Sequence, residues 1–494
     1  MSLKSFLALP YARQQVGRLY HQAKHAVEIQ EKIRQQIVRK AAATQFGKAH
    51  QFAAIRSYSD FKQAIPINDY EGLKSYVDLI KDGARDILWP GKPLYFAKTS
   101  GTTSGSKYIP ITKASISNHI NGAKLALLCN IYHTKRSDFV NGKMIFLSGS
   151  PELDKVAGIY TGRLSGIVNH HVPKYLKANE MPSYATNCIE DWEEKVERII
   201  DETVDANMSL ISGIPPWVQM YFERLLERTG KSTIKEVFPN FDMFVYGGVN
   251  YAPYRAQMER LIGGKVNSVE TYPASEGFIA FQDHPDAEGL LLNSNSGIFF
   301  EFIPAGEVFD EAPTRLQLKD VEIGENYAVI INSNAGLWGY NIGDTVKFVS
   351  KDPYRLLVTG RIKHFISAFG EHVIGEEVDR ALQFALENHA FGVVEYHVAP
   401  MIHTTDELPY HEWNVAFAEP PSDDLAGFAR QIDDQLRSLN TYYDDLRAGN
   451  MLQCLKINAL PADAFRTYMK RKGKLGGQNK VPRLANDRNV ADEL

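Results

Sequence analysis

Short runs of β-branched and aromatic residues alternate with amphipathic helical stretches over the central part of the chain. The strands expected between residues 90 and 304 are LYFA, YIPIT, KMIFLS, FDMFVYGG, SVETYP and GIFFEFIP. Helical stretches, such as residues 189–201 and 217–229, separate them. This alternation favours an α/β sheet covered by helices. Residues 1–45 carry apolar positions at helical spacing and predict one or two amphipathic helices.

The pattern changes in the last third of the chain. Residues 327–350 and 354–369 contain several glycines and predict strands and hairpins. They are followed by a strong helical pattern at 372–390, strands at 395–400 and 411–419, and further helix over 423–449. A unit of about 130 residues is a usual domain size. We therefore predict an α/β protein with a large N-terminal α/β domain, residues 1–360, and a small mobile α+β C-terminal domain, residues 361–494.

Composition narrows the class of protein. The chain has 494 residues, a formal charge of −4 and three cysteines without a CxxC pair. Near-neutral charge gives no reason to expect nucleic acid or an anionic membrane as a partner. The cysteine count fits neither a disulfide framework nor a thiolate zinc site, which predicts a reduced, cytoplasmic compartment. The apolar patch at residues 6–10 is too short for a signal peptide, and no run approaches the roughly 18 apolar residues of a membrane span.

The stretch FAKTSGTTSGSKYIPIT, residues 96–112, has the composition of a phosphate-binding loop. It is not a Walker A loop: counted from Gly101, the second glycine falls on Ser106, and Tyr108 stands where Ser or Thr should bind magnesium. Pro110 and its β-branched neighbours predict a strand after the loop instead of a helix. Glycines, hydroxyls and Lys107 suit a grip on phosphate oxygens, and a flexible hairpin tip is the alternative.

Two common hydrolase signatures are absent from the sequence. No HExxH motif occurs, because His170 and His171 are adjacent and cannot share one face of a helix. No GxSxG nucleophile elbow occurs either, since Ser165 in GRLSG is out of position. Metal-dependent and serine hydrolysis are therefore not expected.

Five segments resemble, in order, the motifs of the acyl-adenylate-forming superfamily. They are TSGTTSGSK (99–107), VYGGVNYAP (245–253), TYPASEG (271–277), YNIGDTVKF (340–348) and VTGRIKHFISAFGEHVIGEEV (358–378). The stretch ILWPGKPLYFAKTSGTTSGSKYIPIT and the C-terminal GGQNKVPRL (476–484) are similar to the Gretchen Hagen family of auxin-responsive acyl acid amido synthetases. The resemblance spans roughly residues 55–484 and implies a compact, bacterial-type member.

The resemblance implies a two-step reaction that uses ATP and Mg²⁺. A carboxylic acid is adenylated to acyl-AMP with release of pyrophosphate, and an amino acid amine then attacks the acyl-adenylate to give an amide. The first step is an in-line displacement, so positioning and charge neutralisation carry the catalysis. The expected partners are a small-molecule carboxylic acid and an amino acid.

The resemblance also assigns the site residues. The phosphates would be held by Ser100, Gly101, Thr102, Thr103, Ser104 and Gly105, with Lys107 nearby; adenine would lie against Gly247, Gly248 and Val249, with Tyr272 stacking on it. Glu276 would bind Mg²⁺ and Ser275 would reach the α-phosphate. Asp344 would accept hydrogen bonds from both ribose hydroxyls, and Arg361 would contact ribose or phosphate. Lys480 would bridge the substrate carboxylate and the α-phosphate.

Each of these residues has a plainer interpretation. Taken alone, Glu276 reads as an exposed strand end, Asp344 as a turn former, and Lys480 as one cation of the solvated basic tail MKRKGKLGGQNKVPRL. In that tail Lys470, Lys472 and Lys474 are the surface candidates. The ordered set of motifs is what favours a functional role for Lys480.

One segment departs from the plant pattern. Plant members carry a lysine in a DKTDE-like run after the GR hinge near Lys363, whereas this chain has Gly370, Glu371 and His372 there. The segment is closer to the wider superfamily. An acyl-CoA ligase of the phenylacetate type, which shares every adenylation residue, is therefore the alternative enzyme. A non-catalytic nucleotide-binding protein is the alternative from another class.

Overall fold

The structure is a computed structural model. It describes residues 3–99, 106–172, 177–189, 191–248, 251–362, 365–366, 368, 371, 373–389, 392–402, 407–421, 425–449, 451–475 and 480–494. The chain forms two compact units. The first comprises Met1–Ile214, Leu225–Gly248 and Val266–Leu357, and the second comprises Pro215–Arg224, Val249–Lys265 and Val358–Leu494. The division at residue 360 into an adenylating domain and a mobile lid stays a prediction.

A large mixed sheet forms the centre of the first unit. In the described part of the chain its strand order is β13-β12-β14-β15-β16-β11-β10-β9-β8-β7-β3-β6. The strands are β3 (Lys143–Phe146), β6 (Glu180–Met181), β7 (Met208–Ser212), β8 (Met243–Gly247), β9 (Asn267–Ala274), β10 (Gly277–Phe281), β11 (Leu290–Leu292), β12 (Ile298–Pro304), β13 (Leu316–Gln317), β14 (Asn326–Ser333), β15 (Tyr340–Lys351) and β16 (Tyr354–Arg361). From β6 to β9 neighbouring strands are parallel, and β9, β10 and β11 then continue antiparallel.

A smaller sheet of the first unit holds the predicted phosphate hairpin. Its strand order is β2-β1-β5-β4, with β1 (Tyr95–Thr99), β2 (Lys107–Ile111), β4 (Asp154–Val156) and β5 (Ile159–Gly162). The strands β1 and β2 are antiparallel, and β1 also pairs with β5 in parallel. The prediction that a strand follows the Ser/Thr/Gly loop is thereby confirmed.

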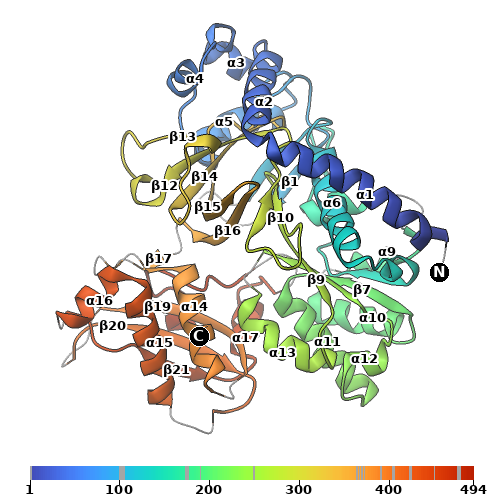
Figure 1. Ribbon diagram of the computed structural model, residues 1–494, viewed down its shortest axis with the longest axis vertical. Helices are drawn as coiled ribbons and strands as arrows, with labels where there is room; N and C mark the ends of the chain where they lie inside the picture. Colours follow the sequence, from blue (N-terminus) through green and yellow to red (C-terminus); the bar gives the residue numbers. More distant parts are fainter. Residues whose placement is uncertain are drawn as a thin grey trace. The chain divides into compact units, whose positions relative to one another are not determined.

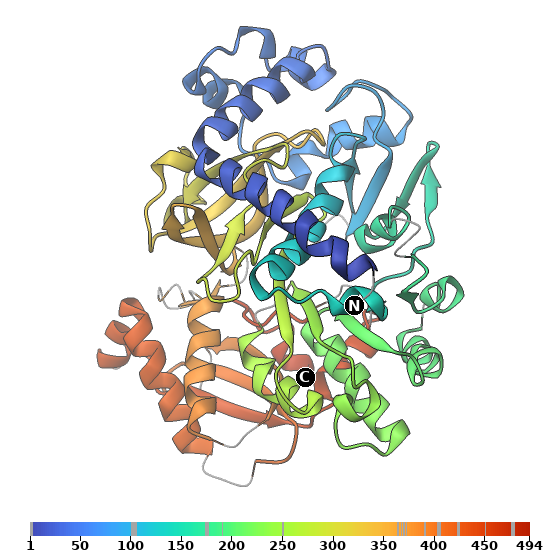
Figure 2. The same cartoon turned by 45° about the vertical axis from the view of Figure 1, so that its right-hand side comes forward.

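Helices pack on both sheets of the first unit. They are α1 (Leu3–Lys24), α2 (Ala26–Ala41), α3 (Gln45–Ala49), α4 (Tyr58–Ala64), α5 (Tyr70–Lys81), α6 (Ile116–Thr134), α7 (Leu164–Asn169), α9 (Tyr184–Asn187), α10 (Trp192–Thr203) and α12 (Ile234–Val237); α11 (Pro215–Thr229) begins in the second unit and ends in the first. The long helices α1 and α6 lie side by side (Figure 1 and Figure 2). The predicted helix at the start of the chain is present as the pair α1 and α2.

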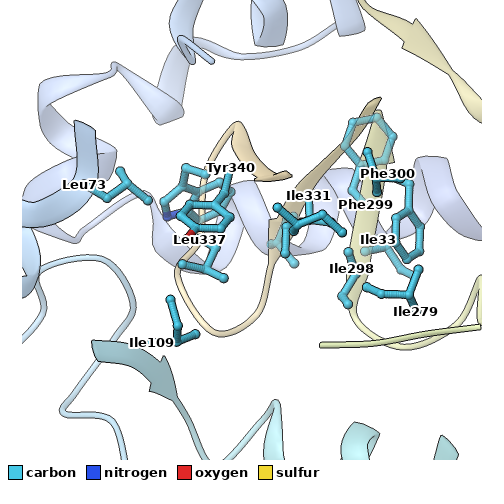
Figure 3. Close-up of a cluster of buried hydrophobic side chains, with 14 of the residues drawn as sticks. Ile33, Leu73, Ile109, Ile279, Ile298, Phe299, Phe300, Ile331, Leu337 and Tyr340 are labelled. Carbon is cyan, nitrogen blue, oxygen red and sulfur yellow. The ribbon is translucent and has the colours of Figure 1, made fainter. Parts of the chain in front are cut away.

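An apolar core joins α2 and α5 to the strands β12 and β14. Figure 3 shows buried side chains from separate parts of the chain meeting there, among them Ile33, Leu73, Ile109, Ile279, Ile298, Phe299, Phe300, Ile331, Leu337 and Tyr340. Burial of such side chains removes apolar surface from water, which is the main favourable term in folding. Tyr340 and Ile342 of the YNIGD motif belong to this core, which holds the start of β15 in place.

The second unit is a three-stranded sheet with helices. Its strands are β19 (Val393–Met401), β20 (Tyr410–Phe417) and β21 (Lys456–Leu460), and a two-stranded ladder joins β17 (Phe365–Ile366) to β18 (Val373–Ile374). Its helices are α13 (Ala252–Ile262), α14 (Gly375–Glu387), α15 (Leu425–Leu439), α16 (Thr441–Ala448) and α17 (Ala464–Arg471). The helices α14 and α15 lie side by side beside the sheet (Figure 1). The helix expected over 423–449 is divided at Asn440, whose side chain caps α16 by accepting from the Tyr443 amide at 2.8 Å.

The α/β class, the large N-terminal sheet and the small C-terminal sheet are confirmed. The six strands predicted between residues 90 and 304 correspond to β1, β2, β3, β8, β9 and β12. No helix in the described ranges is long and apolar enough to cross a membrane.

Candidate functional site

The β1–β2 hairpin closes the loop that carries the Ser/Thr/Gly motif. Thr99 stands opposite Lys107 at the end of the ladder, so both ends of the loop are held by strand pairing. Ser100, Gly101, Thr102, Thr103, Ser104 and Gly105 lie outside the described residues, and their phosphate-binding role stays a prediction.

Lys107 and Tyr108, at the far side of this loop, contact Tyr70 at the start of α5. The Tyr108 amide donates to the Tyr70 hydroxyl at 2.9 Å, and the Lys107 Nζ atom lies 5.9 Å from the centroid of the Tyr70 ring. A cation at this distance from an aromatic ring is attracted by the ring quadrupole. Tyr70 thus holds the base of the hairpin and its lysine together.

Ser275 and Glu276 occupy the two-residue turn between β9 and β10. Ala274 and Gly277 are paired across this turn. The antiparallel pairing of β9 and β10 therefore holds the backbone on both sides of Glu276. Both turn residues are half-buried. The Tyr340 hydroxyl donates to Glu276 Oε1 at 3.5 Å, a long hydrogen bond.

Tyr340 connects Glu276 to the α5 region. Burial raises the pKa of the Tyr340 phenol, and the negative charge of Glu276 followed by that of Asp69 raises it further. Tyr340 therefore stays protonated and acts as a donor to the carboxylate. Tyr70, which contacts the base of the hairpin, also raises the pKa of Tyr340 by a smaller amount.

The position of Tyr340 depends on backbone hydrogen bonds between its two neighbours and Asn68, a residue far away in the sequence. The Asn68 amide donates to the Gly339 carbonyl, and the Asn341 amide donates to the Asn68 carbonyl, each at 2.7 Å. A Cβ atom on Gly339 would lie 2.1 Å from the Pro66 carbonyl oxygen, and its φ is +55°. Only glycine permits this approach, because a side chain would collide with the backbone.

Asp344 and Tyr272 are in direct contact. The Tyr272 hydroxyl donates to Asp344 Oδ2 at 2.7 Å. A bulge in β15 directs Asp344: Ala328 pairs with Thr345 and Ile330 pairs with Asn341, so residues 342–344 face a single residue of β14. Tyr272 itself is buried, with 7% of its surface exposed. The predicted ribose and adenine residues therefore meet across two strands.

The strand β8 ends at Gly247, and Gly248 follows it. Gly247 is paired with Thr271, the residue before Tyr272, and a Cβ atom on Gly247 would lie 2.2 Å from the Thr271 carbonyl oxygen. Gly248 has φ +82°, a conformation that favours glycine. Gly247 is therefore needed for close backbone approach and Gly248 for its positive φ. Val249 lies outside the described residues.

Within the first unit, Lys107 contacts Tyr70, Glu276 contacts Tyr340, and Asp344 contacts Tyr272, the residue after the strand partner of Gly247. Sequence reasoning missed Tyr70, which contacts Lys107, and Asp69, whose charge acts on Tyr340, and it gave no role to Tyr340, the first residue of YNIGD. The signal for Tyr70 was weak: NDY at 68–70 reads as an ordinary helix start, with the Asp69 side chain accepting from the Gly72 amide at 3.0 Å.

Arg361 and Lys480 belong to the second unit. Arg361 is the last residue of β16 and is exposed, and Lys480 is exposed as well. Their predicted contributions to nucleotide and acid binding stay predictions. Lys472, predicted to be at the surface, pairs with Glu493 at 2.6 Å.

The predicted site has one carboxylate, Glu276, for a hard cation such as Mg²⁺ that is bound together with phosphates. In the described ranges no group of three or more His, Cys, Asp or Glu side chains could hold a metal ion. A closed protein cage is thus not formed there, whereas Mg²⁺ commonly takes one or two carboxylates together with substrate phosphates. A single half-buried carboxylate such as Glu276 fits that mode of binding.

Models of one family match the chain from near its start to near its end. The GH3 family N-terminal domain matches residues 15–168 and 148–267, the GH3 family central domain matches 291–361, and the GH3 family C-terminal domain matches 376–489. The first of these alone covers about half of the chain.

Relatives and solved structures agree with these models. The jasmonoyl–L-amino acid synthetase JAR4 of Nicotiana attenuata is 25% identical over 390 residues, which is 66% of this chain and 67% of the relative. The indole-3-acetic acid-amido synthetase GH3.3 of Arabidopsis thaliana is 23% identical over 544 aligned positions, 92% of this chain and 89% of the relative.

Among solved structures, the GH3.15 acyl acid amido synthetase superposes with a TM-score of 0.78 at 16% identity, covering 97% of this chain and 95% of that one. The 2-hydroxyisobutyryl-CoA ligase in its postadenylation state, in complex with 2-HIB-AMP, superposes with a TM-score of 0.63 at 12% identity, covering 94% and 89%. These likenesses concern the fold. The resemblance found in the sequence motifs is confirmed by the family models, and the chain belongs to the GH3 family of acyl acid amido synthetases.

Proposed function

We propose that this chain activates a carboxylic acid with ATP and then joins the acyl group to the amine of an amino acid. The observation that carries the proposal is the contact group of the first unit, in which Tyr340 donates to Glu276 while Tyr272 donates to Asp344. Two carboxylates of the predicted site are thereby held by tyrosine hydroxyls, and the lysine of the predicted phosphate hairpin contacts Tyr70. Family relatives are named as enzymes that act on acyl acids and amino acids. That the chain is of the bacterial type remains part of the proposal.

In the proposed first step, a carboxylate oxygen of the acid forms a bond to the α-phosphorus of ATP and the bond to pyrophosphate breaks. Little covalent chemistry is required of the protein, so orientation and charge neutralisation dominate. Ser275 would donate to the α-phosphate, and the loop 100–105 with Lys107 would hold the phosphate chain. Glu276 would hold Mg²⁺, which supplies positive charge against the phosphate oxygens when bound.

The nucleoside would be held by the strand ends around β8, β9 and β15. Gly247, Gly248 and Val249 would let the backbone approach adenine, with Tyr272 against the base. Asp344 has two acceptor oxygens for the two ribose hydroxyls. Because Tyr272 already donates to one oxygen of Asp344, nucleotide binding requires the carboxylate to share or exchange this hydrogen bond.

The second step moves the acyl group. The amine nitrogen forms a bond to the acyl carbonyl carbon, AMP leaves, and the amine loses a proton.

Lys480 would stabilise the negative charge that develops between acid and α-phosphate in the first step, and Arg361 would contact the ribose or phosphate. Preorganised cations of this kind act at the point where charge develops, so they lower the barrier more than they tighten binding.

The proposal is tested by measuring pyrophosphate release with a panel of carboxylic acids, ATP and Mg²⁺. Each acid is assayed alone, with a mixture of amino acids, and with CoA. Release that depends on the acid and gives an amide in the presence of amino acids supports the proposal. Thioester formation that depends on CoA would identify an acyl-CoA ligase instead. Nucleotide binding with no acid-dependent pyrophosphate release would refute adenylation.

The role of Lys480 is tested by Lys480→Ala, with Lys472→Ala as the matched control in the same basic tail. Lys480→Ala should lower the adenylation rate by about 100-fold or more and leave ATP binding nearly unchanged. Lys472 pairs with Glu493 at the surface, where ion pairs contribute little, so its replacement should leave the rate unchanged. An unaffected rate in Lys480→Ala would show that Lys480 is a solvated surface cation with no role in adenylation.

A further inference from the structure

The segment that follows Lys480 is fixed to strand β19 by its backbone. The Val398 amide donates to the Arg483 carbonyl at 2.8 Å, and the Ala485 amide donates to the Val398 carbonyl at 3.0 Å. Leu484 forms an isolated parallel bridge with Val398 and is 1% exposed. The chain is therefore anchored a few residues after Lys480, whereas Lys480 itself is exposed.

The Arg483 side chain makes a second, larger anchor. Its guanidinium lies 3.3 Å from Glu395 Oε1 and 3.5 Å from Asp379 Oδ1, and it donates to the Tyr254 hydroxyl. Its Cζ atom also lies over two aromatic rings, 5.1 Å from the centroid of Tyr254 and 4.9 Å from that of Tyr396. A planar fork that pairs with carboxylates while stacking on aromatic faces is a role that lysine cannot reproduce.

The partners of Arg483 are themselves tied together. The Tyr254 hydroxyl donates to Glu395 at 3.1 Å, and the Tyr396 hydroxyl donates to Asp379. All four partners are largely buried, and each carboxylate side chain is at most 15% exposed. Burial raises the pKa of the Glu395 carboxyl, while the Arg483 cation opposes that shift. One cation thus serves two carboxylates in this cluster, so its removal would leave both without their shared counter-ion.

We infer that Arg483 is a positioning residue for Lys480: the buried guanidinium fixes the segment three residues beyond the lysine and so limits where its ammonium group reaches. This inference rests on the proposed function, in which Lys480 acts on the reacting groups. Three residues of extended chain span about 10 Å. A displacement of about 1 Å of a catalytic group can cost about 100-fold in rate, so a modest loosening of the anchor is enough to reduce activity.

Tyr254 gives this anchor a second connection. It lies in α13, five residues after Val249 of the predicted adenine segment, and its hydroxyl contacts both Arg483 and Glu395. The same cation therefore holds the helix that follows the adenine motif and the tail that carries Lys480. A purely structural arginine would stabilise the unit without any special dependence on Lys480, and this difference can be measured.

The test is a double-mutant cycle between Arg483→Lys and Lys480→Ala in the full chain. Pyrophosphate release is measured at saturating acid and varied ATP, with single-turnover conditions for the slow variants. Arg488→Lys is the matched control, because Arg488 lies in the same tail and pairs with Glu412 at 2.8 Å and with Asp492 at 2.9 Å. Denaturation midpoints of all variants report on folding.

Arg483→Lys should lower kcat by about 10- to 100-fold with little change in the KM for ATP. In the Lys480→Ala background the same change should lower the rate by less than about twofold, because the two residues act as one unit. Arg488→Lys should leave kcat unchanged. If Arg483→Lys does not fold, Tyr254→Phe replaces it, since it removes one contact of Arg483 and keeps the ring; a smaller loss, again absent without Lys480, is expected.

Two results would overturn the inference in distinguishable ways. Equal losses from Arg483→Lys with and without Lys480, in an otherwise active enzyme, would show that Arg483 acts through general stability alone. A parent protein that releases no acid-dependent pyrophosphate would refute the proposed function itself and, with it, the role of Arg483.

Discussion

Because His119 is buried, we expect the first unit to lose stability as the pH falls. His119 lies in α6, which packs against β9 and β10, and it is 4% exposed. Within the described part of the chain its Nδ1 atom is buried without a hydrogen-bond partner. Burial lowers the pKa of this imidazole from 6.5 to about 4, because the charged form is poorly solvated there.

The sign and the size of the effect follow from this pKa. Since the folded-state pKa lies below the unfolded one, the unfolded chain binds the proton more readily, and stability is lost as pH falls from about 6.5 towards 4. At pH 5 the loss amounts to about 2 kcal/mol, and below pH 4 it approaches about 3.4 kcal/mol. Above pH 7 the imidazole is neutral in both states and contributes no pH dependence.

His119→Leu should remove this part of the pH dependence. Urea unfolding of parent and variant at pH 7.5 and pH 5.0 measures it, because the difference in unfolding free energy between the two proteins should change by about 2 kcal/mol. His25→Gln is the control, at a histidine whose side chain is 54% exposed, and it should leave the difference constant. Parallel pH profiles for parent and His119→Leu would refute the reasoning.

Two further replacements test charged contacts of the first unit. Asp344→Asn should raise the KM for ATP by about 10- to 150-fold, because a hydrogen bond to a charged group contributes about 1.5–3 kcal/mol; steady-state kinetics check this, and an unchanged KM would contradict a ribose role. Asp283→Asn should destabilise the unit by about 3 kcal/mol, because it leaves Arg355, paired with it at 2.6 Å, without its counter-ion in a buried setting. Asp201→Asn, at an exposed pair with Arg228, should cost less than about 1 kcal/mol in the same denaturation assay and is the control.

The elements of the site could be predicted where the signal is local. Pro110 and the β-branched residues around it predict a strand after the Ser/Thr/Gly loop, and β2 is that strand. The segment SVETYP likewise reads as a strand, and Ser275 and Glu276 follow it in a turn. Such predictions succeed because strand propensity and turn formation depend on residues only a few positions apart.

The contacts between these elements could not be predicted in the same way. Tyr70 and Tyr340 are 270 positions apart, and the bridge between Asn68 and Tyr340 that brings them close depends on a backbone approach allowed by Gly339. The bulge that directs Asp344 is also a property of the pairing between β14 and β15. Periodicity in one segment carries no information about such pairings, since they are set by tertiary packing.

The departure from the plant pattern after the hinge has a structural consequence. Glu371, which stands in the segment where plant members carry a lysine, is fully buried, and its Oε1 atom lies 2.8 Å from His411 Nε2, also fully buried. This pair of Glu371 with a histidine of β20 lies in the core of the second unit. Breaking it would leave an uncompensated buried group and would destabilise the unit. In this structure the Glu371 carboxylate therefore faces the interior of the second unit and contacts His411.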